Sequence, residues 1–312
     1  MAAQTPPNNF NSEQPGIVEP WNHEQQIQEL MRRFEILESS TRYAKDKPSF
    51  EINPDDLLVV VLPKHGTTWL LHVCHQIRMK GEEPNFENQI EVFNHIGGLK
   101  TDSKQPVAPY IHMTQVPYPF VPDGGRRIFS FRELKDVVVS AYHFIDSFLA
   151  LKGRVSLPIF AHAYLETIES HLNDLLMWWE HRNDENMLLL FFDDLKEDHA
   201  GAVCRIAKFM KVELDDVAVA RVVHTTSHAE MSRIASKFDI RKIALTLSEK
   251  IGEEPDEIVS RVRKNGGKSG EGKQKLPIEV QERIDQTWKE IVTSKLGFQN
   301  LKEMRQAWMK EH

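Results

Sequence analysis

Short apolar runs and longer amphipathic stretches alternate along most of this sequence. LLVVVL at residues 57–62 and MLLLFF at 187–192 are uninterrupted apolar runs. Their length and composition are typical of strands buried on both faces of a parallel sheet. Two further strands are predicted at 110–116, where prolines follow, and at 127–131.

Helical spacing of apolar side chains occupies the stretches around these strands. It predicts helices at 21–40, 70–80, 135–151, 158–181, 200–210, 215–223, 231–238, 241–251 and 278–295, with Gly297 as the last C-cap. The alternation predicts an α/β fold, a central parallel sheet flanked by helices on both faces. The irregular segment 82–110 is either a loop that gates a ligand site or a variable surface connection.

Composition and charge narrow the classes of partner. Residues 1–20 are polar and proline-bearing and are predicted to be a disordered lead, which leaves 21–312 as a single domain. The net charge of −7 argues against nucleic-acid or anionic-membrane binding, so an anionic ligand needs a local basic pocket. No run approaches the roughly 20 apolar residues of a membrane span. Cys74 and Cys204 lie in apolar helical contexts, which predicts buried thiols, and with no secretory pattern a cytoplasmic protein is expected.

The segment Lys64–Thr68 joins the first apolar strand to a predicted helix. A strand, a glycine turn and a helix N-terminus form a geometry in which backbone N–H groups bind an anion. Gly66 allows close approach, Lys64 supplies charge, and two threonines supply hydroxyl donors. The spacing differs from that of the nucleotide triphosphatase P-loop. An ordinary turn with an exposed lysine is the alternative interpretation.

PKHGTTW at 63–69 resembles the PKSGTTW motif of the cytosolic sulfotransferases, with His65 in place of the serine. That motif binds the 5′-phosphosulfate of 3′-phosphoadenosine 5′-phosphosulfate (PAPS), whose product is adenosine 3′,5′-bisphosphate (PAP). The resemblance therefore implies a P-loop-like phosphosulfate-binding turn formed by Lys64, His65, Gly66, Thr67 and Thr68. FRELKDVVVSAYHF resembles a second family segment, in which Arg132 and Ser140 match the residues that bind the 3′-phosphate.

Three more segments resemble parts of the family's nucleotide site. The loop beginning Arg263, Lys264, Asn265, Gly266 resembles the family loop that covers the 3′-phosphate, with an apparent insertion and with Glu271-Gly272 in place of Asp-Trp. The segment beginning Thr226, Ser227, His228 resembles the adenine-pocket motif, with histidine replacing phenylalanine. Phe192 stands where a family tyrosine approaches adenine, and Trp69 is the remaining candidate to stack on the base.

The general base is the point at which the chain departs from the family. The strand at 108–117 resembles a family strand whose histidine deprotonates the acceptor, but Gln115 occupies the histidine position. An amide cannot act as a base near neutral pH. His112 lies three residues away, on the opposite face of a regular strand, and His65 is the other candidate. Lys64 is the candidate that stabilises the departing phosphate.

The resemblance implies in-line transfer of a sulfuryl group from PAPS to a hydroxyl or amine of a small-molecule acceptor, without a metal. Two readings of the missing histidine stay open: another histidine is the base, or the acceptor needs little deprotonation. The alternatives are a decayed PAPS- or PAP-binding protein and a kinase-like phosphotransferase. Phe144, Phe148 and the segment 118–120 are either acceptor-pocket walls or core. The acceptor is not identified, and Pro277-Ile278 in the family's dimer segment leaves monomer or homodimer open.

Overall fold

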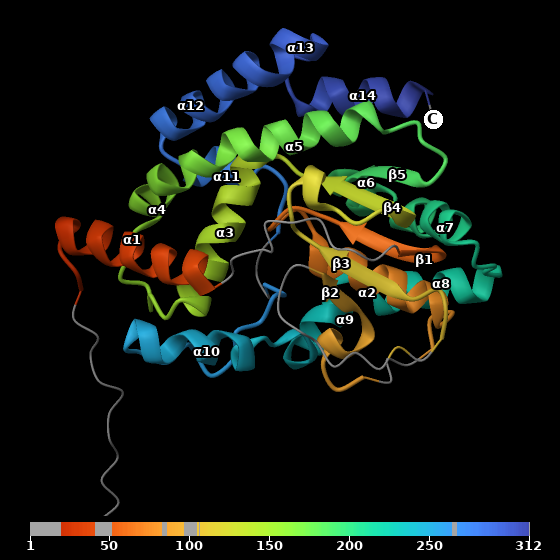
Figure 1. The fold of residues 1–312 in the computed structure, drawn as a ribbon, viewed down its shortest axis with the longest axis horizontal. Coiled ribbons are helices and arrows are strands. Elements are labelled where there is room, and N and C mark those ends of the chain that lie inside the picture. Colours follow the sequence, from red (N-terminus) through yellow and green to blue (C-terminus); the bar gives the residue numbers. More distant parts are fainter. Residues whose placement is uncertain are drawn as a thin grey trace, which may run out of the picture.

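The computed structural model describes residues 20–40, 52–82, 86–96, 105, 107–263 and 267–311. Five parallel strands form one sheet in the order β2-β3-β1-β4-β5 (Figure 1). Their bounds are β1 Ile52–Val60, β2 Asn94–Ile96, β3 Ile111–Thr114, β4 Gly124–Phe131 and β5 Met187–Phe191. The predicted lead lies almost entirely outside the described residues.

The helices surround this sheet. They are α1 His23–Ser40, α2 Thr67–Arg78, α3 Leu134–Phe148, α4 Leu157–Tyr164, α5 Ile168–Glu180, α6 Phe192–Glu197, α7 His199–Met210, α8 Asp216–Thr225, α9 His228–Arg233, α10 Arg241–Ile251, α11 Glu271–Lys275, α12 Ile278–Trp288, α13 Ser294–Leu296 and α14 Leu301–Glu311. Figure 1 shows α12 and α14 on the same side of the sheet as α5. In the described part of the chain, no helix combines the length and hydropathy needed to cross a bilayer.

Alternate side chains of the central strand enter two separate hydrophobic cores. Leu58, Val60 and Leu62 pack with α3, α4, α5 and α12 on one face. Leu57, Val59 and Val61 pack with α2 and α7 on the other face. Period-two alternation in a strand buried on both sides explains the uninterrupted apolar run. The α/β fold with a parallel sheet covered on both faces is therefore confirmed.

The point where β1 and β4 lie side by side is a topological switch. The helix after β1, α2, packs on one face of the sheet, whereas the helix after β4, α3, packs on the other. Because the two connections diverge, a crevice opens at the carboxyl ends of these strands. Lys64 follows β1 and Arg132 follows β4, so both flank this crevice.

Several element predictions need correction. The stretch 158–181 is divided into α4 and α5 by a 3₁₀ turn at Leu165–Thr167. The stretch 278–295 contains a π-helical turn at Lys289–Thr293 before it ends at Gly297, whose φ of 83° confirms the predicted C-cap. Strand β2 and helices α6, α11 and α14 were not predicted. Cys74 is buried as expected, but Cys204 is exposed.

Candidate active site

A cavity of about 1260 Å³ opens at the carboxyl ends of β1, β3 and β4. Its volume exceeds the range of about 300–1000 Å³ that is common for single-ligand pockets, so it has room for two ligands. The residues predicted from the sequence that line it are Lys64, Gly66, Thr67, Thr68, Trp69, Gln115, Arg132, Ser140, Phe192, His228 and Arg263.

The turn between β1 and α2 brings a helix N-terminus to this cavity. Lys64 and Gly66 have φ angles of 69° and 102°, and this left-handed backbone reverses the chain so that α2 begins at Thr67. The first N–H groups of a helix have no partner within the helix, so they are free to bind an anion. A side chain on Gly66 would place Cβ 2.7 Å from the ring of Phe192. Glycine is therefore required on both conformational and steric grounds.

Gly66→Ala is expected to lower the free energy of unfolding by about 1–3 kcal/mol and to weaken PAP binding, because the methyl group is strained at this φ and displaces Phe192. Thermal unfolding and calorimetric titration measure the two effects. Gly297→Ala is the matched control, since its φ is 83° but nothing lies within 4 Å of the added Cβ. It should lose stability without losing PAP affinity. Equal PAP affinities in the two variants would contradict the role of Gly66.

Lys64 places a cation at the turn. Its Nζ lies 4.1 Å from the centroid of the Phe144 ring, which belongs to α3. Burial, together with the nearby charges of Arg132, Arg261 and Arg263, lowers the pKa of Lys64 from 10.5 to about 7. An anion bound at the turn would offset this repulsion. The position of Lys64 therefore favours a negatively charged ligand.

His65 does not line the cavity, although the sequence made it a candidate base and cofactor contact. Its ring is fully buried, and its Nδ1 accepts the backbone N–H of Arg132 at 2.9 Å. Ser130 Oγ donates to the His65 carbonyl at 3.3 Å. Burial lowers the pKa of His65 well below its usual value. The side chain fastens the turn to the end of β4 and cannot reach an acceptor.

Arg132 stands at the carboxyl end of β4, with its side chain buried. The guanidinium carbon lies 4.5 Å from the centroid of the Phe192 ring, and Nε has no partner in the described part of the chain. Ser140, in α3, lines the same cavity. A buried guanidinium with an unused N–H is suited to bind a phosphate.

The segment 270–272, at the start of α11, is hydrogen-bonded to the start of α3. Asp136 accepts the N–H groups of Gly270 and Gly272 at 2.9 and 2.7 Å. A Cβ on Gly272 would lie 2.3 Å from the carbonyl carbon of Lys135, so the replacement of the family tryptophan by glycine permits close packing here. Arg263 forms an ion pair with Glu271. Lys264, Asn265 and Gly266 lie outside the described residues.

Aromatic side chains gather at the α2 end of the cavity. The Trp69 ring meets that of Phe192 edge-on, with the centroids 5.5 Å apart, and its Nε1 donates to the Thr226 carbonyl at 2.8 Å. His228 also lines this part of the wall. Thr226 is fully buried and Ser227 is the N-cap of α9, so both support the wall without lining it. The arrangement offers ring faces and edges to a planar ligand.

Gln115 and His112 lie on opposite faces of the β3 segment. Met113 and Gln115 line the cavity, and the Nε2 of Gln115 donates to the Val61 carbonyl at 3.3 Å and to Thr67 Oγ1 at 3.4 Å. His112 is not among the residues that line the cavity. Its Nε2 lies 3.5 Å from the Asp56 carboxylate. The strand does not bulge at this point, so His112 is kept away from the acceptor.

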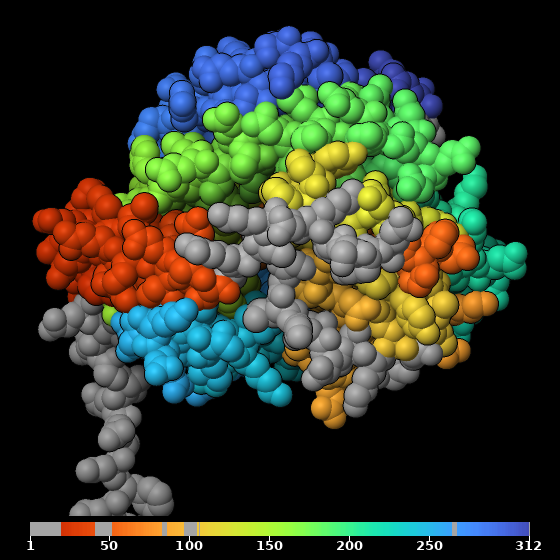
Figure 2. Space-filling view, viewed as in Figure 1, coloured from red at the N-terminus to blue at the C-terminus, as the bar shows by residue number. Residues whose placement is uncertain are grey.

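The other half of the cavity is mainly apolar. Phe144 and Phe148 line it, whereas Tyr118 packs against Trp178 and His181, and the segment 118–120 contributes nothing to the wall. Helix α1 also lines the cavity, through Met31, Phe34 and Leu37. The sequence predicted α1 only as a helix docked on the surface. Figure 2 shows α1 beside α10 at one end of the molecule, where the two helices pack together.

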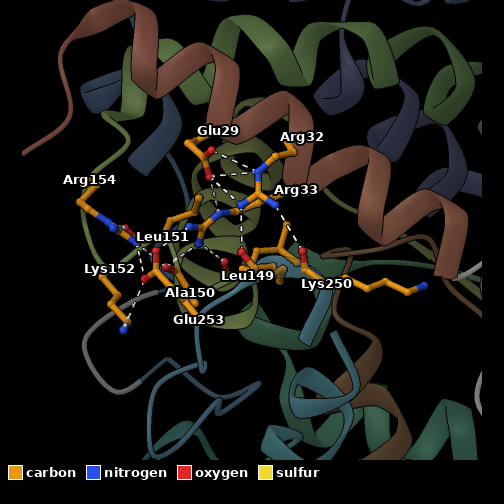
Figure 3. A network of polar contacts seen from close by, with 11 residues as sticks. Glu29, Arg32, Arg33, Leu149, Ala150, Leu151, Lys152, Arg154, Lys250 and Glu253 are labelled. Carbon is orange, nitrogen blue, oxygen red and sulfur yellow. Dashed lines mark hydrogen bonds and ion pairs between the residues drawn. The ribbon is translucent and has the colours of Figure 1, made fainter. Parts of the chain in front are cut away.

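A buried arginine fastens α1 to the rest of the domain (Figure 3). Arg33 Nη1 donates to the carbonyls of Leu149 and Ala150 at 2.5 and 2.7 Å, and Nη2 contacts Glu253 at 3.0 Å. Arg154 shares the same carboxylate at 2.6 Å. The contacts join α1 to the turn after α3 and to the end of α10. They fix the helix that completes the apolar wall.

Arg33→Met is expected to lower the free energy of unfolding by about 1–3 kcal/mol, since it removes the donor to the buried Leu149 carbonyl and one of the two arginines paired with Glu253, while Arg154 keeps its contacts with Ala150 and Glu253. Arg32→Met removes a neighbouring charge from a side chain that is 39% exposed, and should cost about 0.2–1 kcal/mol. Thermal and urea unfolding compare the two variants. Equal losses would show that the buried contacts do not hold α1. PAP affinity should be unchanged in Arg32→Met.

Sequence motifs missed two polar residues of the cavity. Arg261 precedes the recognised loop by two residues; it donates to Gln89 Oε1 at 2.9 Å, and its Nε has no partner among the described residues. Gln89 in turn donates to the Thr68 carbonyl at 2.9 Å, which ties Arg261 to the start of α2. His171, near the start of α5, also lines the cavity. Neither position carries a motif signal. No group of three or more potential metal-ligating side chains occurs in the described ranges.

Comparisons with known proteins agree with this geometry. A family model described as "Sulfotransferase domain" matches residues 54–305. The rabbit (Oryctolagus cuniculus) amine sulfotransferase is 27% identical over 254 residues, which cover 77% of this chain and 82% of that protein. Human (Homo sapiens) sulfotransferase 1E1 is 28% identical over 211 residues, which cover 61% of this chain and 70% of that protein.

Solved structures show the same fold. Retinol dehydratase, in a complex with androsterone and inactive cofactor PAP, aligns with a TM-score of 0.61 at 18% identity and covers 77% of this chain and 81% of its own. Mouse sulfotransferase SULT7A1, complexed with PAP, aligns with a TM-score of 0.57 at 18% identity and covers 90% of this chain and 95% of its own. The chain therefore belongs to the sulfotransferase domain family and is a sulfotransferase.

Proposed function

We propose that this enzyme transfers a sulfuryl group from PAPS to a small-molecule acceptor, with the nucleotide in the basic half of the cavity and the acceptor in the apolar half. The observation that carries the proposal is the convergence of Lys64, the α2 N-terminus, Arg132 and Arg263 on one cavity. PAPS, when bound, supplies the activated sulfuryl group and a phosphate leaving group.

The charges of the cavity fit such a nucleotide. In the described part of the chain, Lys64, Arg132 and Arg261 form no ion pair with a carboxylate, and the last two have a buried Nε without a partner. Burial lowers the pKa of Arg132, and it lowers the pKa of Arg261 to about 10. Cations that are partly or fully removed from water and form no ion pair are costly, and an anion that carries several negative charges would relieve this cost. The protein as a whole is acidic, so the site is a local basic pocket.

Each residue then has a defined task. The N–H groups that begin α2, with Thr67 and Thr68, hold the phosphosulfate, and Lys64 stabilises the charge that develops on the departing phosphate. Arg132, Ser140 and the loop from Arg263 through Lys264, Asn265 and Gly266 hold the 3′-phosphate. Trp69, Phe192 and His228 enclose the adenine, supported by Thr226 and Ser227. Positioning and electrostatic stabilisation carry the reaction.

The apolar wall formed by α1, α3 and α10 favours an acceptor with a large apolar body. We propose that the nucleophile of this acceptor is a hydroxyl or an amine. We propose that residues 21–312 act as one domain and that the protein is cytoplasmic, since both cysteines are free thiols.

Calorimetric titration with PAP tests the nucleotide site, and we expect one site per chain with much weaker binding of adenosine 5′-monophosphate, which lacks the 3′-phosphate. Turnover is tested with radiolabelled PAPS against phenols, alcohols, amines and a metabolite extract, with transfer of label as the readout. Absence of PAP binding would refute the nucleotide assignment. Tight PAP binding without label transfer to any acceptor would refute the catalytic assignment.

A further inference from the structure

Two buried histidines meet where the phosphosulfate turn adjoins the apolar half of the cavity. His65, in the turn, and His171, in α5, have ring centroids 5.2 Å apart, with His65 Nε2 3.4 Å from His171 Nδ1. His171 is 6% exposed and lines the cavity, whereas His65 is fully buried behind it. Neither the motif resemblance nor the proposed tasks above give His171 a role.

The hydrogen bonds fix the tautomer of both rings. The backbone N–H of Arg132 donates to His65 Nδ1 at 2.9 Å, so this nitrogen carries a lone pair and a neutral His65 has its proton on Nε2. That N–H can donate only to the lone pair on His171 Nδ1. The proton of a neutral His171 is therefore on Nε2. Burial lowers the pKa of His171 to about 4, which keeps the ring neutral near pH 7.

His171 therefore offers the cavity a fixed N–H donor and no lone pair that could accept a proton. Nε2 of His171 has no hydrogen-bond partner in the described part of the chain, so its N–H is free to meet a ligand in the cavity. For His171 to act as a base, its proton would have to move to Nδ1. His65 Nε2 would then have to accept this proton and so carry a lone pair. Because His65 Nδ1 already carries a lone pair, the ring would have no N–H and would be an imidazolate anion. The hydrogen bond from the Arg132 backbone N–H to His65 thus prevents His171 from acting as a base.

Gln115 is the second polar residue beside the turn. It contacts Thr67, while His171 contacts His65, so the two flank the same short segment from different elements. Its amide cannot take a proton either. Two other histidines line the cavity. His228 belongs to the aromatic part of the wall at the α2 end, and His95 lies in the edge strand β2, in register with Met113 of β3 and thus two strands from β1. A bound phosphosulfate keeps Lys64 protonated, so in the nucleotide complex no side chain next to the turn is suited to deprotonate an acceptor.

We propose that His171 presents its Nε2–H to the nucleophilic oxygen of an acidic hydroxyl, such as a phenol, which binds as its anion beside Lys64. This inference rests on the proposed function and narrows its acceptor class. An amine is disfavoured, because the N–H donor would engage the lone pair that must attack. Hydrogen bonds to charged groups contribute more than those to neutral groups, so a neutral donor and a cation together favour the phenolate.

The reaction balances without a base in the protein. The hydroxyl proton passes to solvent before or during binding, the phenolate oxygen forms a bond to sulfur, and the sulfur–oxygen bond to the phosphate breaks with its electron pair on the phosphate. The products are the aryl sulfate and PAP. The other titratable side chains that line this half of the cavity are Glu35, Glu38, His95, Tyr164 and Glu166. Burial lowers the pKa of His95 to about 4 and raises that of Tyr164 to about 12, so both are neutral near pH 7.

A chromogenic probe tests the inference directly. 4-Nitrophenol is added to the full-length protein saturated with PAP, at a pH below the solution pKa of the probe, and the visible absorbance of the nitrophenolate is recorded. We expect the wild-type protein to increase this absorbance. His171→Leu should abolish the increase and lower kcat/KM for 4-nitrophenol by about 10- to 100-fold with PAPS. His171→Gln places an amide N–H where Nε2 lies and should restore most of both signals.

His162→Gln, in α4 but with an exposed side chain that does not line the cavity, is the matched control and should keep both the absorbance and the turnover. His95→Gln tests the wall histidine of β2 as a base, and we expect it to turn over 4-nitrophenol. Three outcomes would overturn the inference: no nitrophenolate signal with the wild-type protein, whether the probe binds neutral or not at all; equal signals in His171→Leu and wild type; or loss of turnover in His95→Gln, which would reveal a base. PAP calorimetry on each variant separates these outcomes from failure of the proposed function. PAP should bind all of them alike.

Discussion

Lys64→Met is expected to lower kcat for sulfuryl transfer by about 10²- to 10³-fold, the loss typical of removing one group that stabilises developing charge in a buried site. The side chain lines the cavity at the phosphosulfate turn, and no other lysine or arginine follows β1 there. Initial rates at saturating PAPS and acceptor measure the effect. Lys135→Met removes the same charge from a buried lysine paired with Asp285 outside the cavity, and it should leave kcat nearly unchanged. Comparable losses in both variants would contradict the role of Lys64.

The same lysine predicts proton uptake on nucleotide binding. With a pKa of about 7 in the free protein, most Lys64 side chains are neutral at pH 8, and a bound phosphate raises this pKa. The complex then holds more protons than the free protein, so PAP affinity should fall as pH rises above about 7. Calorimetry at pH 8 in buffers of different ionisation enthalpy measures the uptake. Undiminished uptake by Lys64→Met would assign the proton to another group.

Arg132→Met is expected to weaken PAP binding by about 2–5 kcal/mol, roughly 30- to 5000-fold in Kd, because a buried charge-assisted contact to the 3′-phosphate is lost. Adenosine 5′-monophosphate lacks that phosphate, so its affinity should hardly change. Arg127→Met, in the same strand but directed to Pro122 outside the cavity, is the control and should bind PAP normally. A parallel loss of affinity for both nucleotides would show that Arg132 does not bind the 3′-phosphate.

The sequence predicted the buried centre of the fold well, because a strand covered on both faces leaves an uninterrupted apolar run. It predicted the edge of the sheet poorly. Strand β2 is short and contains Asn94 and His95, so no apolar pattern identifies it. The break between α4 and α5 was missed because apolar spacing continues through the 3₁₀ turn. Cys204 was expected to be buried, yet a position within an amphipathic helix does not decide which face it occupies.

Site residues that belong to a recognised sequence motif were predicted, whereas residues that reach the cavity only through tertiary packing were missed. Turn residues such as Lys64 and Gly66 line the cavity as the resemblance implied. His65 belongs to the same motif but turns inward, because a buried backbone N–H at Arg132 needs an acceptor. His171 and Arg261 enter the cavity from elements without any recognisable pattern. Only the folded arrangement brings them beside the turn.

The matched family region begins at residue 54, whereas α1 ends at Ser40 and still contributes Met31, Phe34 and Leu37 to the acceptor wall. We therefore expect acceptor selectivity to depend partly on a segment that the matched family model does not cover. Replacing α1 with the corresponding segment of a relative should change acceptor selectivity and leave PAP affinity unchanged.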